Sequence, residues 1–326
     1  MANGWTRAET EVLARTLLRA PSVHNIQPWR LEFDGDRLLL RERRELELRE
    51  HDAQGRDRLI SCGAALANVE LAVRVLGYDL TTRVFPEPGA PDIVAAIETT
   101  GRSSPSDVDL HRYSAIARRG SYRHPFSARR ISREKIGDLI AASAGSGVEA
   151  RLIHDELELS RIADLLEFAA EAYQHDLAYQ RELALWTIRD ERYHRHGVGL
   201  AASALPAGSL PWAGLVRTAT AVPDHRVLQR RLAGETLLVF LTLDDGKHDH
   251  LRAGHALQDT WLDAVDDGLA GSVLTQPLHL PEVRSGLIED LELPGFPQAI
   301  MRFGYPTGLV PPSPRRAVDE VLGNGF

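Results

Sequence analysis

The sequence predicts an α+β protein in which two related halves are joined in one chain. Segments with apolar residues at helical spacing, and short apolar or alternating runs typical of strands, both occur along its 326 residues. The order helix, loop, strand and acidic turn occurs twice. Two long helices rich in small residues also share residues at identical spacings, which indicates an internal duplication.

Elements of the first half follow local signals in chain order. Residues 9–19 place apolar side chains on one helical face. The run LEFDGDRLLL alternates on both sides of Asp34 and Gly35, a pair typical of a tight hairpin turn. Residues 61–77 predict a long, largely buried helix that ends at Gly77, and the turn-rich stretch FPEPGAP follows.

The second half contains further helices and strands separated by polar or glycine-rich breaks. Residues 110–117 predict a helix, and Ser132 is suited to cap another helix over 133–143. Strands are expected in EARLIHD, TLLVFLTL and QAIMRF, and long helical segments over about 156–192 and 253–271.

The internal duplication rests chiefly on two helices. Five residues match at identical spacings: Gly63, Ala65, Leu66, Leu71 and Gly77 with Gly254, Ala256, Leu257, Leu262 and Gly268. The segments before these helices match more weakly, through the order of their elements. We therefore expect a first half over 1–105 and a second half over 106–326, lengthened by an insertion at about 156–235.

Composition limits the class of protein. The chain has 43% hydrophobic and 26% charged residues, which is ordinary for a globular protein with a core. Its net charge of -8 gives no general basic field for nucleic acid, and its single cysteine, Cys62, allows no internal disulfide. The start MANGWTRAET lacks a signal core and no apolar run reaches membrane-spanning length, so we expect a cytoplasmic protein without membrane partners.

A polar loop, APSVHNIQPWRLEF, connects the first helix to the first strand. It carries Ser22, His24, Asn25 and Gln27 in close succession. Loops tolerate variation, so a dense set of hydrogen-bonding groups between two regular elements indicates a ligand. A capped turn that merely closes the connection is the alternative.

A basic turn, IARRGSYRHPF, is the second candidate. Arg119, Ser121 and Arg123 cluster there together with Arg118. Guanidinium groups bind phosphate bidentately and a hydroxyl adds one more bond, so the cluster is suited to a terminal phosphate. A solvated basic turn is the alternative.

Two further segments are candidates. The small-residue loop in GLAGSVLTQPLHL, from Gly268 to Leu280, could bring backbone amides close to a planar ligand, or could simply end a helix. Arg302 interrupts an apolar strand, and a buried arginine needs either a carboxylate or a ligand phosphate as its partner.

Two alternating-histidine segments and one charged run in the sequence are interpreted without a functional role. The histidines of His194–His196 and His248–His250 lack a clustered set of cysteines or carboxylates, so no metal is expected. The run RERRELELRE is interpreted as a charged, exposed face of a strand or helix.

These motifs together resemble the nitroreductase family of flavin proteins. The segments that carry the resemblance are APSVHNIQPWR, RRGSYRHPF, AGHALQDTWLDAVDDGLAGSVLTQPL and PQAIMRFGYP, which span most of residues 9–306. The order of the motifs is similar to the Acg-like branch, in which two nitroreductase-like halves are fused. The resemblance implies a nitroreductase-like, FMN-dependent fold arranged as a single-chain pseudo-dimer.

The resemblance also implies one flavin site per chain. Ordinary members are homodimers in which one subunit gives the arginine–serine cluster and the other lends the PSxxNxQPW loop. This chain has each feature once, on different halves, so one complete site and one vacant counterpart are expected.

Cofactor-binding residues are inferred from the resemblance, position by position. Pro21, Ser22, Val23 and Asn25 would approach the flavin, while Gln27 and its neighbours would fix the loop. The phosphate would lie at Arg119, Ser121 and Arg123, with Arg302 arriving from the last strand. Backbone around Leu274, Thr275 and Gln276 would lie near the reactive ring edge, so no catalytic side chain is nominated.

The implied function is that of an oxidoreductase. NAD(P)H would deliver a hydride through FMN to a small acceptor such as a nitroaromatic or a quinone. The alternative is a flavin-binding protein that sequesters FMN under a lid formed by residues 195–223, with little or no turnover. A monomer is sufficient for the site, and a weak homo-oligomer stays open.

Overall fold

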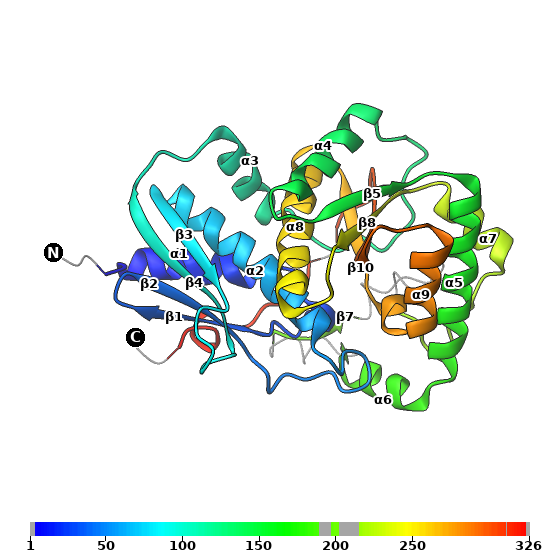
Figure 1. Ribbon diagram of the computed structural model, residues 1–326, viewed down its shortest axis with the longest axis horizontal. Coiled ribbons are helices and arrows are strands. Elements are labelled where there is room, and N and C mark those ends of the chain that lie inside the picture. Colours follow the sequence, from blue (N-terminus) through cyan, green and yellow to red (C-terminus); the bar gives the residue numbers. More distant parts are fainter. Residues whose placement is uncertain (1–3, 189–196, 202–214, 311, 324–326) are drawn as a thin grey trace.

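The computed structural model describes residues 4–188, 197–201, 215–310 and 312–323. Two four-stranded antiparallel sheets lie on either side of two long helices, α2 (Arg56–Val75) and α8 (Lys247–Asp266), which pack against each other (Figure 1). This architecture confirms the α+β prediction, and the two sheets agree with an internal duplication. The half boundaries themselves stay a prediction.

The first sheet has the strand order β1-β2-β4-β3. Its strands are β1 (Trp29–Asp34), β2 (Arg37–Glu42), β3 (Tyr78–Val84) and β4 (Ile93–Arg102). Asp34 pairs with Arg37 across a two-residue turn in which Gly35 has a φ of 64°, as the hairpin signal predicts. Helix α1 (Arg7–Leu18) and α2 cover one face and enclose a core that contains Leu13, Trp29 and Val69.

The second sheet has the order β5-β8-β10-β9 and is buried on both faces. Its strands are β5 (Glu149–Ile153), β8 (Thr236–Thr242), β9 (Ala270–Leu274) and β10 (Phe296–Gly304). Leu237 and Val239 of β8 face one apolar cluster, whereas Leu238 and Phe240 face another. This double burial explains why the run TLLVFLTL is apolar throughout instead of alternating.

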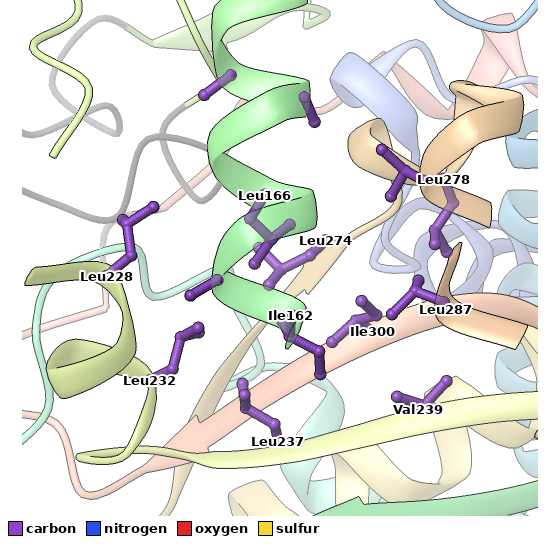
Figure 2. Packing of buried hydrophobic residues seen from close by; sticks show 14 of the residues in the cluster. Ile162, Leu166, Leu228, Leu232, Leu237, Val239, Leu274, Leu278, Leu287 and Ile300 are labelled. Atoms are coloured by element: carbon purple, nitrogen blue, oxygen red, sulfur yellow. The ribbon is translucent and has the colours of Figure 1, made fainter. Parts of the chain in front are cut away.

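Helices on the two faces of the second sheet have different origins. On one face lie α3 (Asp107–Ile116), α4 (Arg133–Ala144) and α8; on the other lie α5 (Glu156–His175), α7 (His225–Leu232) and α9 (Pro281–Asp290). Figure 2 shows side chains of α5, α7, β8 and β10 meeting in one cluster. Ser132 caps α4 through the amide of Lys135, as predicted. Helices α5 and α7 therefore supply much of the cover of one sheet face.

Short elements complete the described chain. They are α6 (Leu177–Leu185), the parallel pair β6 (Thr187–Ile188) and β7 (Leu200–Ala201), and the 3-10 turns η1 (Val23–Asn25), η5 (Gln276–His279) and η6 (Val318–Glu320). No helix in the described ranges combines the length and the apolar character that crossing a bilayer requires.

The C-terminal tail returns from the second half to the first sheet. The amide of Leu31 donates to Val321 O at 2.8 Å, and the amide of Gly323 donates to Leu31 O at 2.9 Å. The tail thereby extends the first sheet beside β1. Backbone hydrogen bonds of the tail therefore join the two halves, in addition to the contact between α2 and α8.

Candidate functional site

A cavity of about 100 Å³ is lined by residues of both halves. Its walls come from the loop after α1, the first turns of α2, the middle of α8 and the chain that leaves β9. Seven of the residues that the sequence predicts at the site line this cavity: Pro21, Ser22, Val23, Ser121, Arg123, Thr275 and Gln276. The structure places Asn25, Arg119, Leu274 and Arg302 outside that lining.

The loop after α1 holds an unusual backbone. His24, Asn25 and Gln27 have φ values of 46°, 58° and 53°, in the left-handed region that residues other than glycine rarely adopt. Ser22 Oγ accepts a hydrogen bond from the amide of Gln27, and the amide of Val23 donates to Ser61 Oγ of α2. Strained backbone of this kind persists only where its surroundings hold it, and it is concentrated at binding sites.

The side chains of Asn25 and Gln27 fix this loop backbone through hydrogen bonds outside the cavity lining. Asn25 Nδ2 donates to Gly199 O at 3.2 Å, and Gln27 Nε2 donates to Gly197 O at 2.6 Å. Their side-chain oxygens accept from Arg315 Nη1 and from the amide of Arg316 in the tail. Both amides therefore bind protein in this structure, and the loop is positioned by the insertion and the tail together.

Ser121 and Arg123 lie on a segment fixed beside β9. Tyr122 donates its amide proton to Gly271 O at 2.9 Å. No hydrogen bond or ion pair to Arg123 is found among the described residues. Burial, followed by the nearby charge of Arg302, lowers the pKa of Arg123 to about 10. An unpaired guanidinium in a cavity wall is suited to an anionic ligand.

Arg119 is buried next to the same wall. Its guanidinium lies 4.9 Å from the ring centre of Trp261, which lines the cavity, and Nη2 donates to Arg19 O. Its Nε has no hydrogen-bond partner. Burial, followed by the charges of Arg315, Arg19 and Arg123, holds the pKa of Arg119 well below its usual range. Arg315 is thus a cation of this cluster that the motifs did not indicate.

The two remaining arginines have carboxylate partners. Arg118 Nη2 lies 3.0 Å from Asp266 Oδ1 and is half exposed. Arg302 is buried and ion-paired to Glu235, with Nε–Oε2 and Nη2–Oε1 distances of 2.5 Å. It also donates to His124 O at 3.0 Å. Of the two partners left open for Arg302, the structure provides the carboxylate, and Arg302 supports the segment that carries Arg123.

The chain after β9 is held by the insertion. Leu274 packs in the core, whereas Thr275 and Gln276 line the cavity. Tyr173 of α5 donates its hydroxyl proton to Gln276 O at 2.9 Å, and Gln276 Nε2 donates to the Tyr179 hydroxyl of α6. These contacts fix the backbone on which the ring edge is expected to lie.

Sequence reasoning missed a group of buried titratable residues in the same wall. His24, His51 and Asp57 line the cavity, and His279 lies against Asp57. The interpretation of RERRELELRE as an exposed charged face is wrong in part: Glu42 is buried, where it pairs with Arg58, and the following turns bury Leu48 and His51. The apolar Leu48 within that charged run was the available signal.

The chain has relatives of similar sequence over nearly its whole length. No family model matches the chain. Rv3131 of Mycobacterium tuberculosis H37Rv, whose name places it among the NAD(P)H nitroreductases, is 30% identical over 322 residues, covering 97% of this chain and 91% of that protein. The chain belongs to the nitroreductase family. Another M. tuberculosis protein of that name, acg, is 28% identical over 93% of this chain and 92% of its own length.

Solved nitroreductase structures resemble part of the chain. The structure of the FMN and NADPH-dependent nitroreductase NfnB from sphigopyxis sp. strain HMH is 20% identical, and the match covers 66% of this chain and 99% of that one with a TM-score of 0.44. The similarity to Rv3131 over nearly the whole chain, together with the two four-stranded sheets, confirms the resemblance to the Acg-like nitroreductases.

Proposed function

We propose that this nitroreductase is an FMN-dependent oxidoreductase that passes a hydride from NAD(P)H to a small acceptor. The observation that carries the proposal is the buried cationic group at the cavity, in which Arg119 and Arg123 lack a carboxylate partner among the described residues. Burying such charges is costly unless an anion joins them. The phosphate of FMN supplies that anion.

The residues present fit the cofactor. Arg123 and Ser121 would hold the phosphate, with Arg119 adding charge from behind Trp261. The strained loop at Pro21–Val23 would cover the ring from the other half, and the backbone at Thr275 and Gln276 would lie near its reactive edge. The bound cofactor would supply hydride transfer between NAD(P)H and an acceptor such as a nitroaromatic or quinone.

The counterpart positions support one site per chain. In the frame that matches Gly63 with Gly254, Ala64 corresponds to His255 and Trp261 corresponds to Glu70. Ala64 and Trp261 line the cavity. His255 and Glu70 instead form an ion pair with an Nε2–Oε2 distance of 3.1 Å. The cavity thus has a small side chain and an aromatic ring at these positions, while the counterpart positions hold a charged pair.

An anaerobic reduction experiment tests the proposal. The protein reconstituted with FMN is mixed with NADPH or NADH in separate runs, and the flavin absorption band is followed. Loss of the band, with its recovery on adding a quinone or a nitroaromatic, is expected. Reduction by dithionite but by neither nicotinamide would contradict the oxidoreductase.

Sequestration of FMN is the second candidate, because both described ends of the suspected lid reach the cavity. Leu200 and Leu215 line it. The intervening anchors named from the sequence, Leu205, Leu210 and Trp212, lie outside the described residues. If the segment restricts access, Leu215→Ala should speed flavin reduction by NADPH in stopped flow at matched flavin content. An unchanged rate would argue against sequestration.

A further inference from the structure

Three side chains from separate parts of the chain converge beside the cavity. His51 comes from the turns after β2, Asp57 from the first turn of α2, and His279 from η5. Asp57 Oδ2 lies 3.4 Å from His51 Nε2 and 3.0 Å from His279 Nε2. The nearest ligand-type atoms of all three residues lie within 4.8 Å of one another.

The imidazole nitrogens at this point have unused bonding capacity. His51 is 3% exposed, and neither of its ring nitrogens has a hydrogen-bond partner. His279 Nε2 also lacks one, although it is only 3.0 Å from the carboxylate oxygen. The ring N–H directions therefore miss the oxygen, and the nitrogens and the carboxylate lie around a common space. A fully buried imidazole without partners, as His51 is, is unusual, because such groups are costly to bury unsatisfied.

The two distances between Asp57 and the histidines are those of a metal centre. Ligand atoms around a tetrahedral zinc, each about 2.0–2.1 Å from the ion, are separated by roughly 3.3 Å. The two distances to Asp57 Oδ2 bracket that value. The His51 and His279 ring centres are 4.8 Å apart and tilted by 54°, so the rings are not stacked face to face.

A second layer of contacts orients the carboxylate. Arg56 Nη2 donates to Asp57 Oδ1 at 3.3 Å, and its Nη1 donates to Leu278 O next to His279. Thr275 donates its hydroxyl proton to Oδ2. Asp52, which accepts from the backbone amides of Asp57 and Arg58, adds a second buried carboxylate beside this turn. Hydrogen bonding of a carboxylate ligand from outside is typical of metal sites.

We propose that His51, Asp57 and His279 bind a first-row divalent cation of borderline softness, such as Zn²⁺ or Co²⁺. Two imidazoles and one carboxylate are a donor set that such ions accept, and they leave further coordination positions free. His51 and Asp57 line the first cavity, while His51 and His279 line a second cavity of about 390 Å³, so the ion has a path from outside. The site stands independently of the proposed flavin chemistry.

Equilibrium dialysis of the full-length protein against Zn²⁺, followed by elemental analysis, tests the site. About one zinc per chain is expected, and His279→Ala should weaken binding by on the order of a hundredfold. The more exposed group Asp164, Glu167 and His225 is a control, because its ligand atoms lie within the same 4.8 Å of one another. His225→Ala should leave the tight zinc bound.

A second readout separates binding from folding. Co²⁺ bound by this site should give visible absorption of a low-symmetry complex in flavin-free protein, which His279→Ala and Asp57→Asn should both abolish while far-ultraviolet circular dichroism stays unchanged. Absence of zinc from the unaltered protein, or equal loss in His225→Ala and His279→Ala, would overturn the proposal. So would zinc retained in full by His279→Ala.

Discussion

Gly63 of α2 lies against the carbonyl group of Leu251, three residues before Gly254 of α8, and Gly254 lies against the carbonyl group of Ile60, three residues before Gly63. A Cβ on Gly63 would lie 1.9 Å from Leu251 O, and a Cβ on Gly254 would lie 1.8 Å from Ile60 O. The contact is therefore symmetric, as two copies of one ancestral helix would make it. Backbone on both sides leaves no flexible group that could move aside.

Alanine at either glycine should therefore force the central helices apart. Gly63→Ala or Gly254→Ala should lower the free energy of unfolding by about 3 kcal/mol or more, because the clash involves rigid backbone. Gly137→Ala is the control: it lies in helix α4 with no atom near its missing Cβ, and should raise stability by about 0.5–1 kcal/mol. Urea denaturation measures all three, and equal effects would contradict the close-packed crossing.

The cationic wall predicts a specific loss of flavin affinity. Arg123→Ala removes a charge-assisted contact worth roughly 1.5–3 kcal/mol, so FMN should bind about tenfold to a hundredfold more weakly. Arg118→Ala should change affinity little, because Arg118 is already paired with Asp266. Titration of FMN fluorescence compares the two variants. Equal affinities would place the phosphate elsewhere.

The flavin content should be one FMN per chain. The ion pair of His255 and Glu70 occupies the positions that correspond to Ala64 and Trp261 of the cavity, so the counterpart site has no equivalent room. Release of flavin by denaturation and measurement of its ratio to protein tests this directly. A ratio near two would contradict the single-site argument.

The buried pair of Arg302 and Glu235 should stabilise the fold more than it binds ligand. Arg302→Met strands a buried carboxylate and should lower the free energy of unfolding by about 3–5 kcal/mol. Adding Glu235→Leu removes the stranded charge and should restore much of that loss. FMN affinity, measured by fluorescence titration, should be near normal in the double variant. Recovered stability without recovered affinity would show that Arg302 touches the cofactor.

The network around His255 should make stability fall at alkaline pH. Burial alone lowers the pKa of His255, but hydrogen bonds to Asp259 and Glu70 outweigh it and raise that pKa to about 10. The folded state therefore keeps a proton that the unfolded chain loses above about pH 6.5. This contribution is complete below pH 6.5 and declines up to about pH 10, by at most about 1.4 kcal/mol per pH unit.

Denaturant midpoints between pH 6 and pH 10 measure this decline. His255→Gln should flatten it, while His250→Gln, at a histidine whose pKa is lowered chiefly by burial, should leave it in place. If stability still declines with pH in His255→Gln, groups other than His255 cause the alkaline loss.

The sequence by itself determined the features that depend on neighbouring residues. The hairpin at Asp34 and Gly35, the cap at Ser132 and the periodic helices follow local backbone preferences, which act within a few residues. The five shared spacings indicated the duplication, because a repeated helix keeps the residues that pack it. The ligand-type loop at Pro21–Val23 and the basic turn at Ser121–Arg123 were also recognisable, since each is contiguous in the chain.

Tertiary structure decided which of these groups meet. Arg302 needed a partner, but only the β8–β10 packing brings Glu235 to it and leaves Arg123 for the cavity. Asn25 and Gln27 are occupied because the insertion and the tail return to the loop from more than 160 residues away. His51, Asp57 and His279 converge only when η5 is placed against the start of α2. Local propensity acts only between neighbours in the chain, so it cannot specify these contacts, which depend on how distant segments pack together.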